Sequence, residues 1–229
     1  MAARAAAWEA NPAYPAREAI ALAAEAVGDK PKAAMFDLAD RGYRSVFQQL
    51  VSCVISIRTR DEESLPISIR LFDAAPSPEA VAALGEDAIA ALIAPSTYAE
   101  QKAPRIREIA RRTVNEFGGE LPCDPAVLQG FAGVGPKCAN LAAGVACGTP
   151  VVSVDVHVHR VTNRWGLVRT NTPERTGEAL ASVLPDDLKV EINRVLVPFG
   201  KHVCTGARPW CSRCPVRPIC ARVGITDSR

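Results

Sequence analysis

Four cysteines near the C-terminus limit the folding of this chain more than any other feature. In order they are Cys204, Cys211, Cys214 and Cys220, separated by gaps of six, two and five residues. Four thiolates in one short segment can bind a single metal centre without a ligand from elsewhere in the chain. We therefore expect a compact metal-binding loop in this part of the protein.

Three kinds of site compete for this cysteine loop. A structural zinc site usually has two cysteine pairs with short internal gaps, and here only Cys211 and Cys214 form such a pair. A disulfide framework suits small secreted chains. This chain has 229 residues, and Arg4 and Glu9 interrupt the apolar segment that a signal peptide would need. The spacing favours an iron–sulfur cluster, with zinc as the alternative.

The other four cysteines follow no ligand pattern. They are Cys53, Cys123, Cys138 and Cys147. Because they are scattered, we expect them to be small buried side chains. Free cysteines without a signal peptide indicate a reducing, cytoplasmic environment. At 48% hydrophobic residues the chain can form one large domain or two small ones, and it has no apolar run of membrane-spanning length.

Positive charge is unevenly distributed along the chain. The formal net charge is only +2, yet residues 201–222 contain five Lys and Arg and no Asp or Glu. Further basic clusters occupy residues 102–112 and 160–169. One such cluster is usually a solvated helix face, but three of them on a modest domain favour a surface that meets an anionic partner.

Most of the sequence has helical character. Amphipathic stretches cover residues 18–27, 43–57, 79–93, 105–117 and 187–197. Pro66 and Pro104 fall inside helical patterns, where we expect them to kink or restart the helix. Residues 151–161 alternate valines like a strand, but Val158 and Trp165 also share a helical face, so the period leaves this segment undecided.

A glycine-containing turn stands between two predicted helices. The first helix begins near Asp124, the turn contains Gly133 and Gly135, and Pro136 opens an Ala-rich second helix. Backbone amides in such a turn and at a helix N-terminus bind phosphate well. A helix-hairpin-helix of this kind would hold the DNA backbone without reading its sequence. An ordinary turn with two glycines is the alternative.

Two ionisable residues need an explanation beyond solubility. Lys137 lies in the first turn of the second helix, where the helix dipole disfavours a cation, so it should lose its proton more readily and act as a nucleophile. It could also simply contact a phosphate. Asp155 lies among apolar neighbours in the Val-rich segment, which requires a cap, an ion pair or a catalytic role.

Taken together, these motifs resemble the endonuclease III family of DNA glycosylases. The resemblance rests on residues 128–143 with Lys137, on residues 154–161 with Asp155, and on the cysteine loop, and it extends from about residue 40 to Cys220. It implies an all-α fold with two helical domains. Residues 39–149 would form a six-helix barrel with the helix-hairpin-helix at about 124–147, and residues 1–38 and 150–229 a domain holding a 4Fe–4S cluster.

The same resemblance implies a mechanism. Lys137 would attack C1′ of a damaged nucleotide, expelling the base and leaving a covalent Schiff base, and β-elimination would then cut the strand. Asp155 would stabilise the positive charge on the sugar, with His157 nearby as a support residue. The nucleotide must leave the duplex to react. The cluster would shape a loop for DNA contact, and the residues expected at DNA there and in the hairpin are Arg208, Arg213, Arg217, Gly133 and Gly135.

Two departures from the family pattern concern the substrate. Arg58 stands where the family has a glutamine that fills the gap left by the flipped base. Arginine is longer and can hydrogen-bond an orphaned base, so the preference is expected to change. Thr97 stands where a bulky apolar wedge is common. Both are candidate DNA contacts.

The resemblance leaves three functions open. The first is a monomeric glycosylase and abasic-site lyase that removes oxidised pyrimidines such as thymine glycol from double-stranded DNA, near the nucleoid of a bacterial-type cell. The second is a related glycosylase for mismatched adenine or pyrimidine dimers, although Lys137 argues against the adenine-specific relatives. The third is a DNA-binding cluster protein with weak catalysis.

Overall fold

Every regular element in the described part of the chain is helical. The computed structural model describes residues 10–229; Arg4 and Glu9, which interrupt the N-terminal apolar segment, lie outside these residues. Within residues 10–229 the only β pairing is an isolated bridge between Ala10 and Val168. The predicted all-α class is therefore confirmed. No described helix has the length and apolar character needed to cross a membrane.

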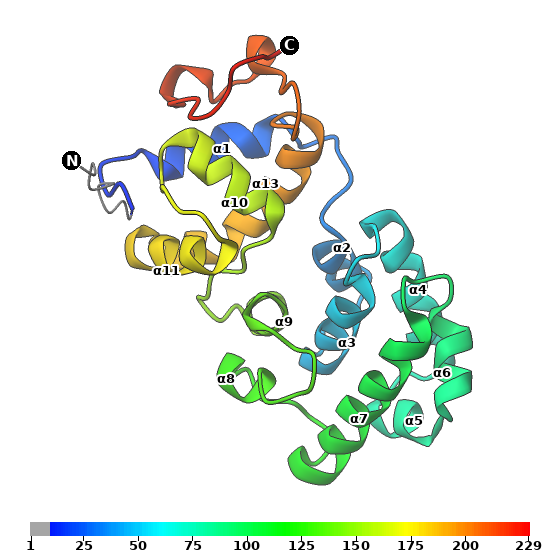
Figure 1. Cartoon of the computed structure of the whole chain (residues 1–229). Helices are drawn as coiled ribbons and strands as arrows, with labels where there is room; N and C mark the ends of the chain where they lie inside the picture. The colour runs from blue at the N-terminus through cyan, green and yellow to red at the C-terminus, as the bar shows by residue number, and fades with distance from the viewer. Residues whose placement is uncertain (1–9) are drawn as a thin grey trace, which may run out of the picture. The chain divides into compact units, whose positions relative to one another are not determined.

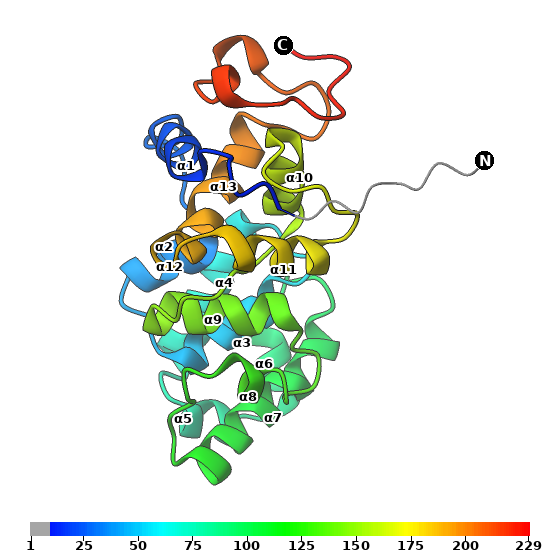
Figure 2. The same ribbon diagram turned by 90° about the vertical axis from the view of Figure 1, so that its left-hand side faces the viewer.

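The chain divides into two compact units. One runs from Lys32 to Val151, and the other combines the segment up to Pro31 with the segment from Val152 onward. Figures 1 and 2 show the helices of each unit from two directions. Each unit has a hydrophobic core of its own, so each is described separately.

The continuous unit is built around one buried helix. Its helices are α2 (Ala34–Asp40), α3 (Val46–Ser56), α4 (Asp61–Ala74), α5 (Pro78–Ala83), α6 (Glu86–Ile93), α7 (Ala99–Phe117), α8 (Pro125–Leu128) and α9 (Pro136–Cys147). A capping box of Ser45 and Gln48 starts α3. Leu50 and Val51 are fully buried, because α3 packs against α4, α7 and α9.

Both disulfides lie in this unit. Cys53 of α3 is bonded to Cys138 of α9, and Cys123 to Cys147, with Cα–Cα distances of 5.6 and 6.1 Å. The expectation that these four cysteines are unpaired buried side chains is wrong. Cys53 and Cys138 are buried, whereas Cys123 and Cys147 are exposed. The spacing of the cysteines along the chain indicated neither pair, because the bonded residues come together only in the folded structure.

The described part of the discontinuous unit has five α-helices and ends in an irregular cysteine loop. They are α1 (Ala16–Glu25), α10 (Val156–Trp165), α11 (Pro173–Val183), α12 (Asp186–Lys189) and α13 (Glu191–His202), followed by short 3₁₀ turns at Cys211–Arg213 and Arg217–Ile219. Trp165 is almost fully buried; it stacks on Tyr14 and meets Phe199 edge-on. These aromatic contacts pack α10 and α13 together beneath the loop.

The Val-rich segment is a helix preceded by an extended stretch. Asp155 adopts an extended backbone and caps α10, while Val158, Val161 and Trp165 face the core. The cap decides the outcome, because it gives the first amides of a helix an acceptor that no strand would need. The helical alternative is therefore correct, against the β propensity of valine.

Three details of the predicted helices differ in the structure. Pro66 and Pro104 do not restart their helices; α4 and α7 run through them. Each proline is the sixth residue of its helix, where it removes the hydrogen bond to the carbonyl four residues earlier. The predicted helix at 79–93 is two helices, α5 and α6, separated at Leu84 and Gly85.

Candidate functional site

The predicted helix-hairpin-helix is present and consists of α8, the glycine-containing turn and α9. Asp124 caps α8 by accepting the Ala126 amide at 2.8 Å. Gly133 has a φ of +81°, and an added Cβ would lie 2.9 Å from Arg105 Nη1. Gly135 caps α9 with an ordinary φ of −94° and open space around it. The turn therefore requires glycine at position 133, while position 135 tolerates a side chain.

Lys137 is exposed in the first turn of α9. The next residue, Cys138, is buried and covalently joined to α3. The lysine thus extends from a helix end that is fixed to the core of its unit. Fixed attachment of this kind suits a nucleophile, which must be held within a fraction of an ångström of its target.

Asp155 uses one oxygen for structure and is half-buried. Its Oδ1 accepts the amides of His157 at 2.9 Å and Val158 at 2.8 Å. The His157 ring packs on Gly200, and its Nδ1 lies 3.2 Å from the guanidinium of Arg160. Asp155 is therefore a helix cap in a fixed orientation, and His157 is held by α13.

Arg58, Thr97 and Tyr98 lie together at the end of α3 and the start of α7. Thr97 Oγ1 donates to the Arg58 carbonyl at 2.9 Å, and the Thr97 amide donates to Thr59 Oγ1 at 3.1 Å. Arg58 and Tyr98 both have left-handed backbones, with φ of +55° and +61°. Their side chains are exposed, and the guanidinium lies 6.0 Å from the Tyr98 ring.

The exposed ring of Tyr98 was missed in the sequence. Thr97 stands in the expected wedge position, but its hydroxyl donates a hydrogen bond to the Arg58 carbonyl. Tyr98 is instead the large side chain on the surface, with 50% of its area exposed. An aromatic residue in a loop beside a basic one is the signal that could have identified it, because bases stack on such rings.

The four C-terminal cysteines are free and line one cavity. Trp165, Phe199 and Trp210 complete its apolar wall, and its volume is about 20 Å³. Two sulfurs have N–H donors: Arg222 N lies 3.4 Å from Cys220 Sγ, and Arg164 Nη1 lies 3.5 Å from Cys204 Sγ. Within residues 10–229, no group of three or more His, Cys, Asp or Glu is arranged to hold a metal ion.

The cavity disfavours free thiolates. Burial raises the pKa of Cys214 to about 11 and also raises the pKa of Cys220, and the neighbouring cysteines add to both shifts. Four thiolates in so apolar a site therefore require positive charge from a bound group.

The predicted DNA-facing arginines of this loop are in three different environments. Arg208 forms an ion pair with Asp227 at 2.9 Å. Arg213 lies over the Trp210 ring, 3.9 Å from its centroid, opposite a second stacked arginine, Arg229. Arg217 is exposed beside the cavity. Only the first of these has its charge balanced by an acid, which lies beyond the acid-free span 201–222.

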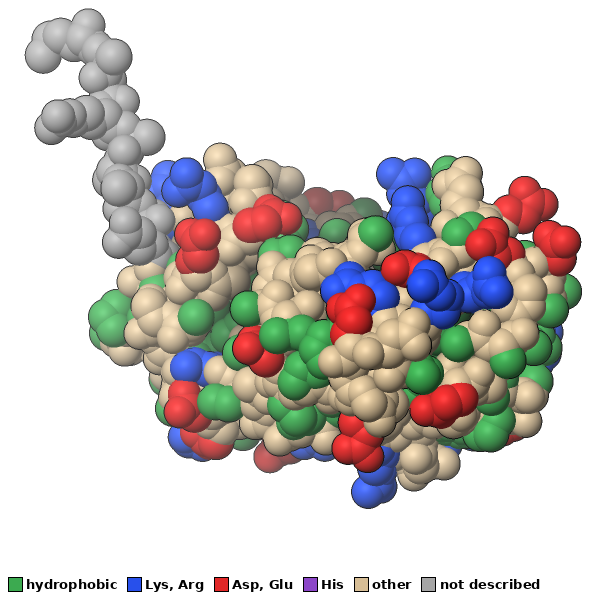
Figure 3. Space-filling model, turned by 90° about the horizontal axis from the view of Figure 1, so that it is seen from below, with side chains coloured by type: hydrophobic (Ala, Val, Ile, Leu, Met, Phe, Trp, Pro, Cys, Tyr) green, Lys and Arg blue, Asp and Glu red, His purple; other side chains and the backbone are tan. Residues whose placement is uncertain are grey.

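The basic cluster on α7 is mainly a solvated, ion-paired face. Arg111 pairs with Glu108 at 2.8 Å and Arg112 with Glu116 at 2.9 Å. Figure 3, seen from the end where α5, α7 and α8 lie in Figure 1, shows Lys and Arg side chains beside Asp and Glu. Arg112 also lies over the Phe131 ring and so supports the hairpin.

Comparisons with known proteins agree on one family. Residues 51–186 match the model of the HhH-GPD superfamily base excision DNA repair proteins. Endonuclease III of Thermotoga maritima is 41% identical over 76% of this chain and 82% of its own length. Endonuclease III of Escherichia coli K12 is 29% identical over 78% and 84%. The chain belongs to the endonuclease III family.

A solved structure supports the same assignment. It is a trapped endonuclease III–DNA covalent intermediate in an estranged-adenine complex, with 25% identity and a TM-score of 0.78 over 90% of this chain and 94% of that one. The resemblance recognised in the sequence is thereby confirmed. This family member is a base-excision repair DNA glycosylase.

The hairpin offers a matched pair of substitutions. Gly133→Ala should destabilise the protein by about 1–2 kcal/mol, because alanine resists a left-handed backbone and its Cβ would meet Arg105. Gly135→Ala should leave stability within about 0.5 kcal/mol of the parent. Urea unfolding of both variants measures the difference, and equal losses would contradict the assigned roles of the two glycines.

Proposed function

We propose that Lys137 is the nucleophile of a bifunctional glycosylase and abasic-site lyase. The observation that carries the proposal is an exposed lysine in the first turn of α9, fixed by the adjacent Cys138, in the region that matches the superfamily. The covalent intermediate described for a related endonuclease III supports amine chemistry of this kind.

The chemistry follows from an amine that attacks a sugar. Neutral Lys137 would form a bond to C1′ while the C1′–N bond to the base breaks and the base takes the electron pair. Loss of an amine proton and opening of the sugar ring give a protonated Schiff base. Removal of a C2′ proton then expels the 3′ oxygen with its phosphate, which cuts the strand.

Asp155 would provide negative charge for this reaction. Its Oδ1 accepts two amides of α10, and this fixes the direction of the carboxylate. A fixed carboxylate stabilises the positive charge that develops on the sugar as the base departs. His157, packed on Gly200, would support this arrangement from behind.

Double-stranded DNA with a damaged base or an abasic site would be held through its phosphates. Amides of the hairpin turn and of the α9 N-terminus suit phosphate oxygens. Arg217 and Arg213 would add positive charge from the cysteine loop. Arg208, which is paired with Asp227, would contribute less unless phosphate displaces the acid.

Arg58 and Tyr98 would act where the base leaves the stack. Arg58 is exposed and could donate hydrogen bonds to the orphaned base, and the Tyr98 ring offers a stacking surface. Their left-handed backbones cost about 1–3 kcal/mol each. Such strain at two neighbouring exposed residues favours a role in substrate binding.

Oxidised pyrimidines of the thymine glycol type are the proposed substrates. Arg58 in place of the family glutamine makes the opposite-base preference the property most open to change. Turnover on a panel of thymine glycol, uracil, pyrimidine dimer and abasic duplexes would rank them. We also propose that the protein acts as a monomer in a cytoplasmic compartment where it meets the nucleoid.

A 4Fe–4S cluster is the group proposed for the cysteine cavity. Cys204, Cys211, Cys214 and Cys220 are free thiols on one apolar cavity, and N–H donors already face two of the sulfurs. Such a donor set suits iron and sulfide. When bound, the cluster would hold the loop together, which makes this unit the cluster domain and residues 32–151 the barrel domain.

The lysine assignment can be tested by trapping. Borohydride should fix a covalent complex between the protein and thymine glycol or abasic duplex DNA, and Lys137→Ala should abolish it. Lys32→Ala removes another exposed lysine of the same unit and should trap normally. Trapping that persists in Lys137→Ala would place the nucleophile elsewhere.

The charge and the capping function of Asp155 can be separated. Asp155→Asn keeps a good cap and should lower turnover about 10²-fold or more with near-normal DNA affinity and stability. Asp155→Ala should also lose about 1 kcal/mol of stability. If Asp155→Asn turned over at the parent rate, a catalytic carboxylate would be excluded.

Removal of the cluster should lower the affinity for DNA more than it lowers the rate of the lysine chemistry, which takes place in the other unit. The purified protein should be brown and contain about four irons and four sulfides per chain. Iron chelation should weaken binding to duplex DNA, because the loop that carries Arg213 and Arg217 would lose its support. A colourless protein holding stoichiometric zinc would overturn the cluster assignment.

A further inference from the structure

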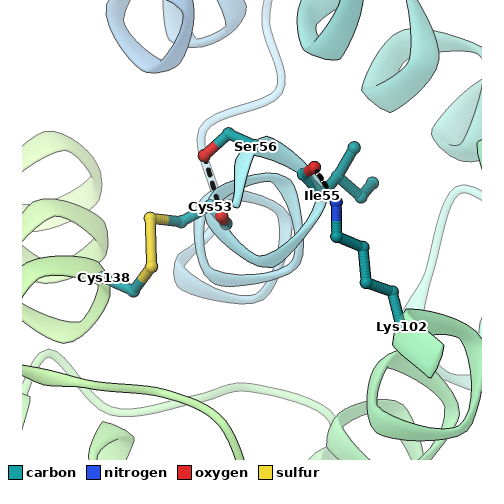
Figure 4. Close-up of a disulfide and its surroundings, with 5 residues drawn as sticks. All are labelled: Cys53, Ile55, Ser56, Lys102 and Cys138. Atoms are coloured by element: carbon teal, nitrogen blue, oxygen red, sulfur yellow. Dashed lines mark hydrogen bonds between the residues drawn. A yellow bond between two sulfur atoms is a disulfide. The ribbon is translucent and has the colours of Figure 1, made fainter. Parts of the chain in front are cut away.

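Lys102 is a buried lysine with all of its donors in use. It lies on α7 with only 3% of its surface exposed. Its ammonium donates to the carbonyls of Ile55 at 2.6 Å and Ile57 at 2.9 Å, and to Thr59 Oγ1 at 3.2 Å. Figure 4 shows the side chain reaching from α7 to the end of α3. Three N–H groups and three acceptors match completely.

The end of α3 explains why a cation is held there. The last carbonyls of a helix accept no hydrogen bond from within the helix, and they lie at the negative end of its dipole. Lys102 therefore caps the C-terminus of α3 with a charge. Burial lowers the pKa of Lys102 to about 8, so the site retains the ammonium near neutral pH against a cost of desolvation.

The acceptors of Lys102 frame the backbone of Arg58. Ile57 and Thr59 lie on either side of it, and both contact the ammonium. Thr59 Oγ1 also accepts the Thr97 amide, and Thr97 Oγ1 donates to the Arg58 carbonyl. The left-handed conformation of Arg58 is thus enclosed by a continuous hydrogen-bond network that begins at Lys102.

The backbone of Lys102 is also hydrogen-bonded to the backbone of Tyr98, the second residue with an exposed side chain. The Lys102 amide donates to the Tyr98 carbonyl at 3.0 Å, in the first turn of α7. On another side of α3, the Cys53–Cys138 disulfide joins it to α9, whose first turn carries Lys137 (Figure 4). The C-terminal end of α3 is therefore fixed to both neighbouring helices.

We propose that Lys102 is a positioning residue that determines which base the enzyme accepts opposite the lesion. It fixes the turn that presents Arg58 and the start of α7 that presents Tyr98. It has no surface with which to contact DNA, so it acts through these two residues. The proposal rests on the proposed function, in which Arg58 fills the gap left by the flipped nucleotide.

The test compares substrates with and without an opposite base. Lys102→Met keeps the length of the side chain and removes its donors. On thymine glycol duplexes it should lower kcat/KM by about tenfold and reduce the difference between adenine and guanine opposite the lesion. On a single-stranded abasic oligonucleotide, which has no orphaned base, it should stay within about twofold of the parent.

A double-mutant cycle separates positioning from general stability. If Lys102 acts through Arg58, the loss in Lys102→Met combined with Arg58→Ala should be clearly smaller than the two single losses added together. Equal losses on single-stranded and duplex DNA, or additive losses in the double variant, would overturn the proposal and leave Lys102 a purely structural residue. So would an Arg58→Ala variant with the parent's opposite-base preference.

A second variant covers the case in which Lys102→Met does not fold. Thr97→Val removes the exposed hydroxyl that binds the Arg58 carbonyl and leaves the buried ammonium in place. It should show the same duplex-specific loss, about threefold in size; an unchanged opposite-base preference would overturn the network. If the parent cleaves neither thymine glycol nor abasic DNA, the proposed function fails instead.

Discussion

The buried contact between the Lys102 ammonium and the carbonyl end of α3 determines how the continuous unit presents its surface. A helix end in an apolar core would leave carbonyls without donors, and an ammonium there would lack a counter-charge. The ammonium supplies the missing donors, and the carbonyls supply the negative partial charge that it needs. The turn that leaves α3 is fixed as a result, and with it the exposed side chains of Arg58 and Tyr98. Helix α3 thus supports the turn and, through the Cys53–Cys138 disulfide, also supports α9, which carries the candidate nucleophile.

The discontinuous unit solves a different problem. Its last residues form only two short 3₁₀ turns, so the loop has little regular backbone structure to stabilise it. Aromatic side chains replace that structure: Trp165 and Phe199 form the wall of the cysteine cavity, and Trp210 lies between two guanidinium groups. A bound cluster would complete a site whose sulfurs already face N–H donors. The basic surface and the cavity proposed for the cluster are therefore parts of one packing arrangement rather than two separate motifs.

Features that depend on neighbours in the sequence were predictable, and features that depend on tertiary contacts were not. The turn at Gly133 and the cysteine spacing are local, so the hairpin and the family could be inferred from the residues, whereas the period of the Val-rich segment left α10 undecided. The two disulfides and the burial of Lys102 require contacts between segments that are distant in sequence. Thr97 was placed at the wedge position because the resemblance gives only a position in the loop, whereas the folded structure shows that the neighbouring Tyr98 is the large exposed side chain.

The Cys123–Cys147 disulfide gives the hairpin a property that neither helix has alone. It joins Cys123, two residues before α8, to the last residue of α9, so α8, the glycine turn and Lys137 all lie within one covalent ring. A ring connects any two of its points by two routes. A single backbone break between residues 123 and 147 would leave both halves attached, with each helix still anchored at one end. The segment proposed to hold the phosphate backbone and supply the nucleophile would thus stay connected after a single cut. The longer ring closed by Cys53 and Cys138 has the same property and shares residues 123–138 with it.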